Sequence, residues 1–192
     1  DEEADLAYVF YHKVYLEPGA FKFIDIGHSI AIWKNFDQPL ERPEFGYYED
    51  YPTLFFSEER DGFGSAAVLV DRTLYVYGCH MVPDDIFKPC RVARVDIDDI
   101  LDRDSWEFYH GQGRWSSSLQ GAARVFRGNN MMTVFYNEYL SRYVVVYSVP
   151  LGTEVAMRVA DKPEGPWSEP MTLFRGVTPE SRSGWIYDAL AH

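Results

Sequence analysis

Short runs of aromatic and β-branched residues, separated by turn-forming residues, recur along almost the whole chain. The first two runs extend from Leu6 to Leu16 and from Phe21 to Trp33, with Pro18-Gly19 between them. Runs of this length and composition are typical of half-buried strands. Aromatic residues make up 17% of the chain, whereas the long Ala/Leu/Glu/Lys runs of a helical protein are missing. The sequence therefore predicts an all-β fold.

Two groups of four short strands follow a polar stretch over 34–52. The expected strands are 64–70, 73–79, 90–97 and 106–110 in the first group, and 131–136, 143–149, 153–159 and 167–174 in the second. Successive four-stranded antiparallel meanders, each about 50 to 60 residues long, are the pattern of propeller blades. A β-sandwich would have similar strands, and the repetition favours the propeller. We expect residues 1–192 to form one incomplete propeller domain, with blades at about 1–60, 61–117 and 118–176 and a partial blade at 177–192.

The formal net charge of the chain is −12, which disfavours nucleic acid and anionic membranes as partners. Nucleic-acid affinity comes largely from Lys and Arg that replace counterions. Neutral glycans bind by stacking and hydrogen bonding, so they remain possible partners. No apolar run approaches the roughly 20 residues that span a bilayer, and the acidic Asp1–Asp5 segment is the reverse of a basic signal-peptide n-region. We expect no membrane insertion and no nucleic-acid partner.

The two cysteines flank one predicted hairpin. Cys79 ends the run 74–78 and Cys90 begins the run 91–95, so they face each other if these strands are antiparallel neighbours. A disulfide there would stabilise the fold by about 3 kcal/mol and would imply an oxidising compartment. Two free buried thiols are the alternative. A metal site at Cys79, His80 and Cys90 is disfavoured because a fourth ligand is not evident.

Four segments, taken in order, resemble one family. Val134–Ser148 and Met157–Pro170, the latter with an Ala-Asp-x-Pro-x-Gly-Pro-Trp-Ser core, are similar to segments of five-bladed glycosidase-like propellers. Together with Asp61–Ala67 and Tyr187–His192, they resemble the domain-of-unknown-function family 4185, distantly similar to glycoside hydrolase family 43 and to endo-arabinan hydrolases. The resemblance, over about residues 6–192, implies a five-bladed propeller that cleaves or binds a polysaccharide outside the cell. The family's acidic N-terminal segment is not in this chain, so carboxylates placed there cannot be carried over.

Three carboxylates are candidate catalytic groups, because glycoside hydrolysis normally uses two acids that flank the bond. Asp188 is the strongest candidate, on an expected inner strand with His192 four residues later on the same side. Asp25 precedes the apolar run that follows Gly27. Glu138 lies in an expected hairpin loop. Each has an ordinary alternative, since acids are common at strand ends and in turns.

Four further residues are candidate sugar contacts, namely His28, His192, Trp185 and Tyr187. The histidines could bind sugar hydroxyls, and tryptophan offers a stacking platform, which Trp33 and Trp115 could also provide. Most tryptophans in a propeller pack between blades. No metal site or cofactor is expected. The Asp-rich run over 96–104 lacks the glycine and terminal glutamate of an EF-hand loop, so we expect it to be a solvated, helix-capping face.

The leading functional prediction is a glycoside hydrolase, endo-arabinanase-like, acting on an extracellular or cell-wall polysaccharide. It would be secreted, periplasmic or on the cell surface. No Gly-x-Ser-x-Gly, His-Glu-x-x-His or phosphate-loop motif occurs, which disfavours serine hydrolases, zinc proteases and nucleotide enzymes. A non-catalytic carbohydrate-binding propeller, or a scaffold segment of a larger assembly, is the alternative.

Overall fold

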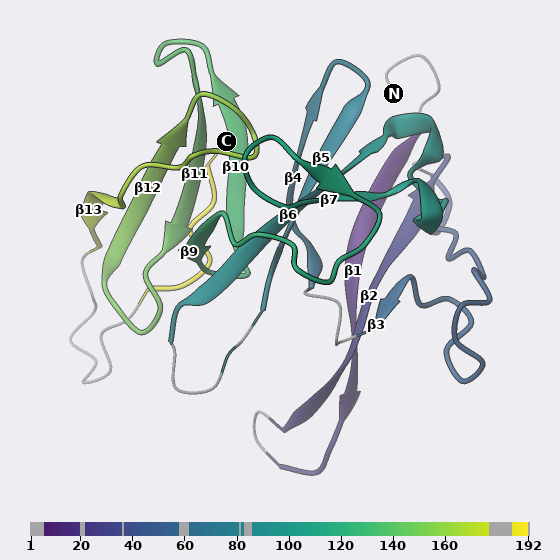
Figure 1. Ribbon diagram of the computed structural model, residues 1–192. Coiled ribbons are helices and arrows are strands. Elements are labelled where there is room, and N and C mark those ends of the chain that lie inside the picture. Colours follow the sequence, from purple (N-terminus) through teal and green to yellow (C-terminus); the bar gives the residue numbers. More distant parts are fainter. Residues whose placement is uncertain are drawn as a thin grey trace. The chain divides into compact units, whose positions relative to one another are not determined.

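The computed structural model describes residues 6–19, 22–35, 37–57, 62–80, 82, 86–176 and 186–191. Its strands are antiparallel and form three sheets of three, six and four strands (Figure 1). The expected all-β fold is confirmed. The chain divides into two compact units, Asp1–Gly64 and Ser65–His192. Among the described residues, no helix has the length and apolar character needed to cross a bilayer.

The first unit contains the three-stranded sheet. Strands β1 (Ala7–Leu16) and β2 (Phe23–Trp33) form a long hairpin around Pro18-Gly19, and the short β3 (Phe56–Ser57) pairs with β2. Residues 29–32 of β2 and residues 54–56 are buried, and the ring of Phe55 meets those of Phe45 and Phe56 edge to face. The buried apolar residues of this unit are Ile30, Ala31, Ile32, Leu54, Phe55, Phe56 and Phe63.

The second sheet follows the first predicted group of strands. Its order is β4 (Phe63–Val70), β5 (Thr73–Cys79), β6 (Lys88–Asp96), β7 (Glu107–Tyr109) and β8 (Trp115–Ser116), and β9 (Phe126–Gly128) also pairs with β6. Asp71-Arg72 is the expected two-residue turn between β4 and β5. The two-residue β8 and three-residue β9 were not predicted, because runs this short carry no periodic pattern.

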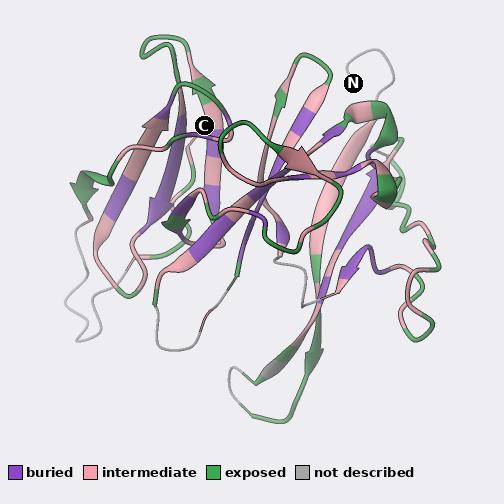
Figure 2. Cartoon of the chain, viewed as in Figure 1, coloured by how far each residue is buried: buried purple, intermediate pink, exposed green. Residues whose placement is uncertain are grey.

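The third sheet is a four-stranded meander. It consists of β10 (Met132–Asn137), β11 (Arg142–Ser148), β12 (Glu154–Ala160) and β13 (Met171–Arg175), each paired with the next. Strand β11 is buried over its last five residues, and Figure 2 shows it among the buried parts of the meander. The last strand begins four residues later than expected, because Ser168 instead donates its backbone N–H to Val159 and accepts a second bond at Oγ.

The acidic run of the second unit is structural. Asp96 and Asp102 accept backbone N–H groups at the starts of two 3-10 turns, η1 (Ile97–Asp99) and η2 (Arg103–Ser105). Arg72 pairs with Asp96 and Asp98. This agrees with the helix-capping role expected for the Asp-rich run.

The sheets taken singly are open and do not show a propeller. The ring of blades and the blade boundaries therefore stay predictions. One expectation about local structure is wrong, since residues 186–191 carry no strand although an inner strand was expected there. This segment is held by single bonds, including those of Ala189 and Ala191 to the side chains of Ser148 and Thr133, and not by a ladder.

Candidate functional site: a histidine–aspartate cluster on the β1–β2 hairpin

A one-residue bulge in β2 brings together three side chains with metal-binding chemistry. Lys13 is opposite Gly27 and Val14 is opposite Asp25, which leaves Ile26 without a partner. Because side chains alternate along a strand, residues 25 and 28 would lie on opposite faces without the extra residue. With the bulge, His28 is directly opposite His12, and Asp25 is opposite Val14, which shares the face of His12.

Gly27 makes this arrangement possible. Its φ of +138° is a conformation that residues with a side chain rarely adopt. It is opposite Ser57, and a Cβ at this position would lie 2.9 Å from Ser57 Cα and would overlap the backbone oxygen of Phe56. The backbone of β3 therefore approaches β2 closely, next to the cluster.

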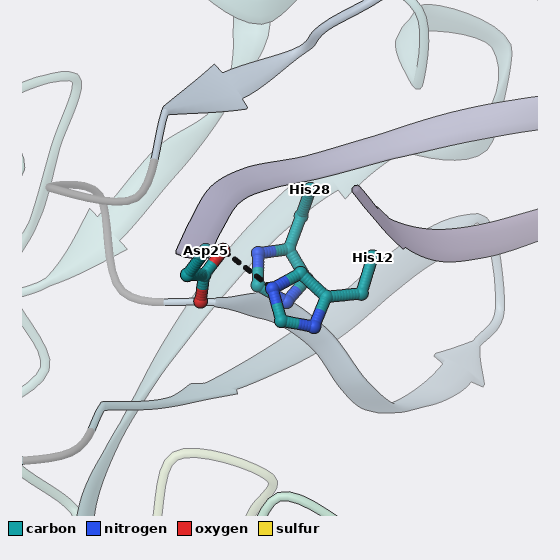
Figure 3. Close-up of side chains that lie close together, drawn as sticks. All are labelled: His12, Asp25 and His28. Atoms are coloured by element: carbon teal, nitrogen blue, oxygen red, sulfur yellow. Dashed lines mark hydrogen bonds and ion pairs between the residues drawn. The ribbon is translucent and has the colours of Figure 1, made fainter. Parts of the chain in front are cut away.

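The three side chains are in direct contact (Figure 3). His12 Nε2 lies 2.5 Å from Asp25 Oδ1, and the rings of His12 and His28 stack at 4.3 Å between centroids with 8° between planes. One ligand atom from each residue can be chosen so that all three lie within 4.8 Å of one another. The side chains of His12 and Asp25 are 36% and 41% exposed, so the cluster is open to solvent.

The electrostatic environment keeps His28 neutral. Burial, followed by the charge of His12, lowers the pKa of His28 to about 4, while Asp25 acts in the opposite direction. Its Nδ1 is buried and has no hydrogen-bond partner in the described part of the chain. His28 therefore keeps a lone pair available at neutral pH.

Two imidazoles and one carboxylate are the protein ligands of several catalytic zinc sites, which leave a fourth position for water. Donors on one tetrahedral zinc ion lie about 3.3 Å apart, given bonds of about 2.0 to 2.2 Å. Ion binding would therefore require the two rings to rotate out of their stack and Asp25 to exchange its bond with His12 for the ion.

The structure places the other sequence candidates outside this cluster. Glu138 is exposed at the tip of the β10–β11 hairpin, as expected for a loop residue. Asp188 is exposed with a φ of +60°, and Tyr187 is 72% exposed. No described contact brings Asp188 and Glu138 together. Trp185 and His192 lie outside the described residues.

Trp33 and Trp115 have structural contacts. Trp33 donates its indole N–H to the backbone oxygen of Gln38. Trp115 packs against Tyr75 and Tyr109, and the Arg94 guanidinium lies 4.4 Å from its ring centroid. These contacts are those of packed aromatic side chains.

Sequence reasoning singled out Asp25 and His28 but missed His12. The hairpin itself could have indicated His12. Pairing the residues of the two strands outward from the turn at Pro18-Gly19 places His12 opposite the region of Gly27 and His28. The bulge then decides which of the two it faces.

A disulfide joins Cys79 and Cys90, which are paired across β5 and β6. Both sulfurs lie in a buried cluster with Tyr77, Val92 and Phe126. The bridge closes a short loop, because the two cysteines are 11 residues apart in sequence.

The comparisons with known proteins agree with the all-β architecture. A solved structure from Bacteroides ovatus ATCC 8483, described as a "putative hydrolase", superposes with a TM-score of 0.50 at 16% identity. It covers 88% of this chain, whereas this chain covers 46% of that protein. At this identity the likeness concerns the fold alone, and the chain spans about half the length of its neighbour.

No curated protein matches the sequence. A family model matches residues 31–189, and the chain therefore belongs to the domain-of-unknown-function family DUF4185.

Proposed function

We propose that this chain is part of an extracellular hydrolase that acts on a polysaccharide, and that His12, Asp25 and His28 form its reactive centre around a divalent metal ion. The observation that carries the proposal is the convergence of these three side chains at the bulge. These three side chains meet only because β2 has an extra residue and a glycine beside it, so their convergence requires a specific local backbone geometry.

The chemistry follows from the donor set. A zinc ion bound there would supply a Lewis acid and lower the pKa of a bound water to about 7. The protein would contribute the imidazole nitrogens of His12 and His28 and an oxygen of Asp25. The exposed side of the cluster leaves room for water and substrate.

Two observations support a polysaccharide substrate outside the cell, and a third supports hydrolysis as the reaction. The sequence resembles glycosidase-like five-bladed propellers, as described above. The disulfide is typical of oxidising compartments. The structural neighbour's description as a hydrolase supports the reaction class. On this proposal the three sheets are blades of a propeller whose other part lies outside residues 1–192.

One observation favours a second candidate, a non-catalytic carbohydrate-binding propeller. The cluster contains one carboxylate, whereas glycosidic bonds are normally cleaved between two. In that case the ion would hold sugar hydroxyls without activating water. Asp188 and Glu138 remain candidate carboxylates for a glycosidase, and Tyr187, His192 and Trp185 remain candidate sugar contacts.

The test combines metal binding and activity. Chelator-treated protein is titrated with zinc by calorimetry, and the zinc-loaded protein is assayed for reducing sugar released from arabinans, xylans and related polymers, and for acyl groups released from acetylated glycans. We expect one zinc ion per chain, with binding lost in His12→Gln, Asp25→Asn and His28→Gln.

His110→Gln is the matched control, because His110 is also half-buried but contacts the backbone oxygen of Ser118 in the second unit. Product release that depends on zinc and on the three residues supports the hydrolase. Zinc-dependent polymer binding without product supports the carbohydrate-binding module. Equal zinc binding by the wild type and the three variants would overturn the metal centre.

A further inference from the structure

A second candidate site lies in the second unit, well removed in sequence from the β1–β2 hairpin. It is a cavity of about 540 Å³, a size typical of small-molecule sites. Three of the lining residues are arginines and one is a glutamate. Among the described residues the lining consists of Pro89, Arg124, Val125, Phe126, Arg127, Arg158, Trp167 and Glu169, and we call this the arginine pocket.

Arg158 is held rigidly by its surroundings. Its Nε donates to the Tyr147 hydroxyl, its Nη1 donates to the backbone oxygen of Ser168 at 2.7 Å, and its Nη2 donates to that of Arg127. Each of these acceptors comes from a different element of the chain. The guanidinium has five N–H groups, so two remain for a ligand while the other three fix its position.

The other two arginines are more exposed. Arg127 lies on β9 opposite Pro89, and its guanidinium lies 5.5 Å from the centroid of the Phe87 ring. Arg124 makes no hydrogen bond or ion pair within the described part of the chain. The cavity thus combines one fixed cation, Arg158, with an exposed one, Arg124, that can adjust.

The charge of the arginine pocket is opposite to that of the whole protein. The chain carries a formal net charge of −12, yet among the described lining residues arginines outnumber acids three to one. Burial, and then the positive charge of Arg124, lower the pKa of the neighbouring Arg91. Like charges are therefore crowded here, and an anion would relieve their repulsion.

Trp167 forms an aromatic part of the same lining. Its indole packs edge to face against Phe126 and Tyr77, with centroids at 5.3 and 6.3 Å. Its Nε1 is buried and has no hydrogen-bond partner in the described structure.

We propose that the arginine pocket binds the oxyanion group, carboxylate or sulfate, of an acidic sugar. The oxyanion part of this proposal rests on the pocket itself, and the sugar part rests on the proposed function. Guanidinium groups match carboxylate and sulfate oxygens with paired, charge-assisted hydrogen bonds. Arg158 provides the fixed donors, Arg124 can turn toward the ligand, Arg127 adds positive charge to the lining, and the volume accommodates one sugar unit.

Calorimetric titration of the full chain with three probes tests this proposal. The probes are glucuronate, glucose 6-sulfate and glucose, which carry a carboxylate, a sulfate and no charge. We expect an acidic probe to bind and glucose not to bind. Arg124→Gln and Arg127→Gln should each weaken binding at least about tenfold, the loss of one charge-assisted hydrogen bond.

Arg114→Gln is the matched control, because Arg114 is an exposed arginine of the same unit outside the pocket. It removes the same charge and should leave the affinity within about twofold. Comparison of the two acidic probes decides between carboxylate and sulfate. Binding should persist in His12→Gln, which separates the pocket from the metal centre.

Three results would overturn the proposal. One is equal affinity for glucose and the acidic probes. Another is an equal loss of affinity in Arg114→Gln and in the pocket variants, which would mean that the probes are attracted by charge without a specific site. The third is no binding of any probe by the wild type. If the acidic probes fail to bind while polysaccharide hydrolysis is observed, the pocket proposal alone fails.

Discussion

The close approach of β3 to β2 at Gly27 can be tested by adding a single methyl group. In Gly27→Ala the new Cβ would overlap the Phe56 carbonyl oxygen and lie 2.9 Å from the Cα of Ser57. These are backbone atoms, so no side-chain rotation relieves the overlap, and β3 would have to move away. The φ of +138° adds backbone strain.

The expected loss has two parts. An unfavourable backbone conformation costs about 1 to 3 kcal/mol, and overpacking costs about 1 to 3 kcal/mol more. We therefore expect the free energy of unfolding to fall by about 4 kcal/mol. Gly46→Ala is the control, because Gly46 has a φ of +70° but nothing within 4 Å of its Cβ position. It should lose only about 1 kcal/mol, from strain alone.

Urea unfolding of both variants, followed by tryptophan fluorescence, measures the difference. Amide hydrogen exchange at residues 28–32 shows whether the loss is local to the hairpin. Zinc affinity should fall in Gly27→Ala and not in Gly46→Ala, because only the first displaces the bulge that positions His28. Losses that agree within about 1 kcal/mol would refute the argument from close approach.

Three other predictions follow from the structure. The double variant Cys79→Ala/Cys90→Ala should lose about 3 kcal/mol of unfolding free energy, the entropy of a closed loop of this length; an unchanged urea midpoint would contradict it. Because the folded pKa of His28 is about 4 and its ordinary value is 6.5, the unfolded state binds more protons between these pH values. In the presence of chelator, the contribution of His28 to the free energy of unfolding should be fully present above pH 6.5. It should fall by about 2 kcal/mol on acidification toward pH 4, a figure reduced because His28 is partly exposed. The His28→Gln variant should lose less unfolding free energy than the wild type over the same pH range. Equal losses in the two proteins would contradict this prediction. Tyr77→Phe should lose about 1 to 2 kcal/mol in thermal unfolding, because the buried hydroxyl donates to the Pro163 carbonyl at 2.7 Å; a stability equal to that of the wild type would show that this bond contributes nothing.

Much of the secondary structure was predictable from local pattern. The hairpin around Pro18-Gly19, the turn at Asp71-Arg72 and both groups of strands are where the alternating aromatic and β-branched residues indicated. The 2–3 residue strands β8 and β9 were not predictable, because runs this short carry no periodic pattern. In addition, β9 pairs with β6, which is distant in sequence. The segment over 186–191 has the composition of a strand, yet it lacks a paired neighbour and forms none.

The candidate site, like the secondary structure, was only partly predictable from the sequence. Sequence alone identified Asp25 and His28 as chemically capable groups beside a glycine, and it placed the cysteines at facing strand ends. It could not place the bulge at Ile26, because one unpaired residue costs little locally and is selected by the fit of β2 between β1 and β3.

The amino-acid sequence by itself determined the strand content, the antiparallel neighbours and the acidic charge of this protein, since these depend on residue type and spacing along the chain. Only the tertiary structure decided that His12 faces His28, that Asp25 joins them, and that arginines from two separate segments, 124–127 and β12, line one cavity. The physical reason is that a strand has two faces, and a shift of one residue in register exchanges them. Which face a side chain occupies is therefore decided by its partners across the sheet.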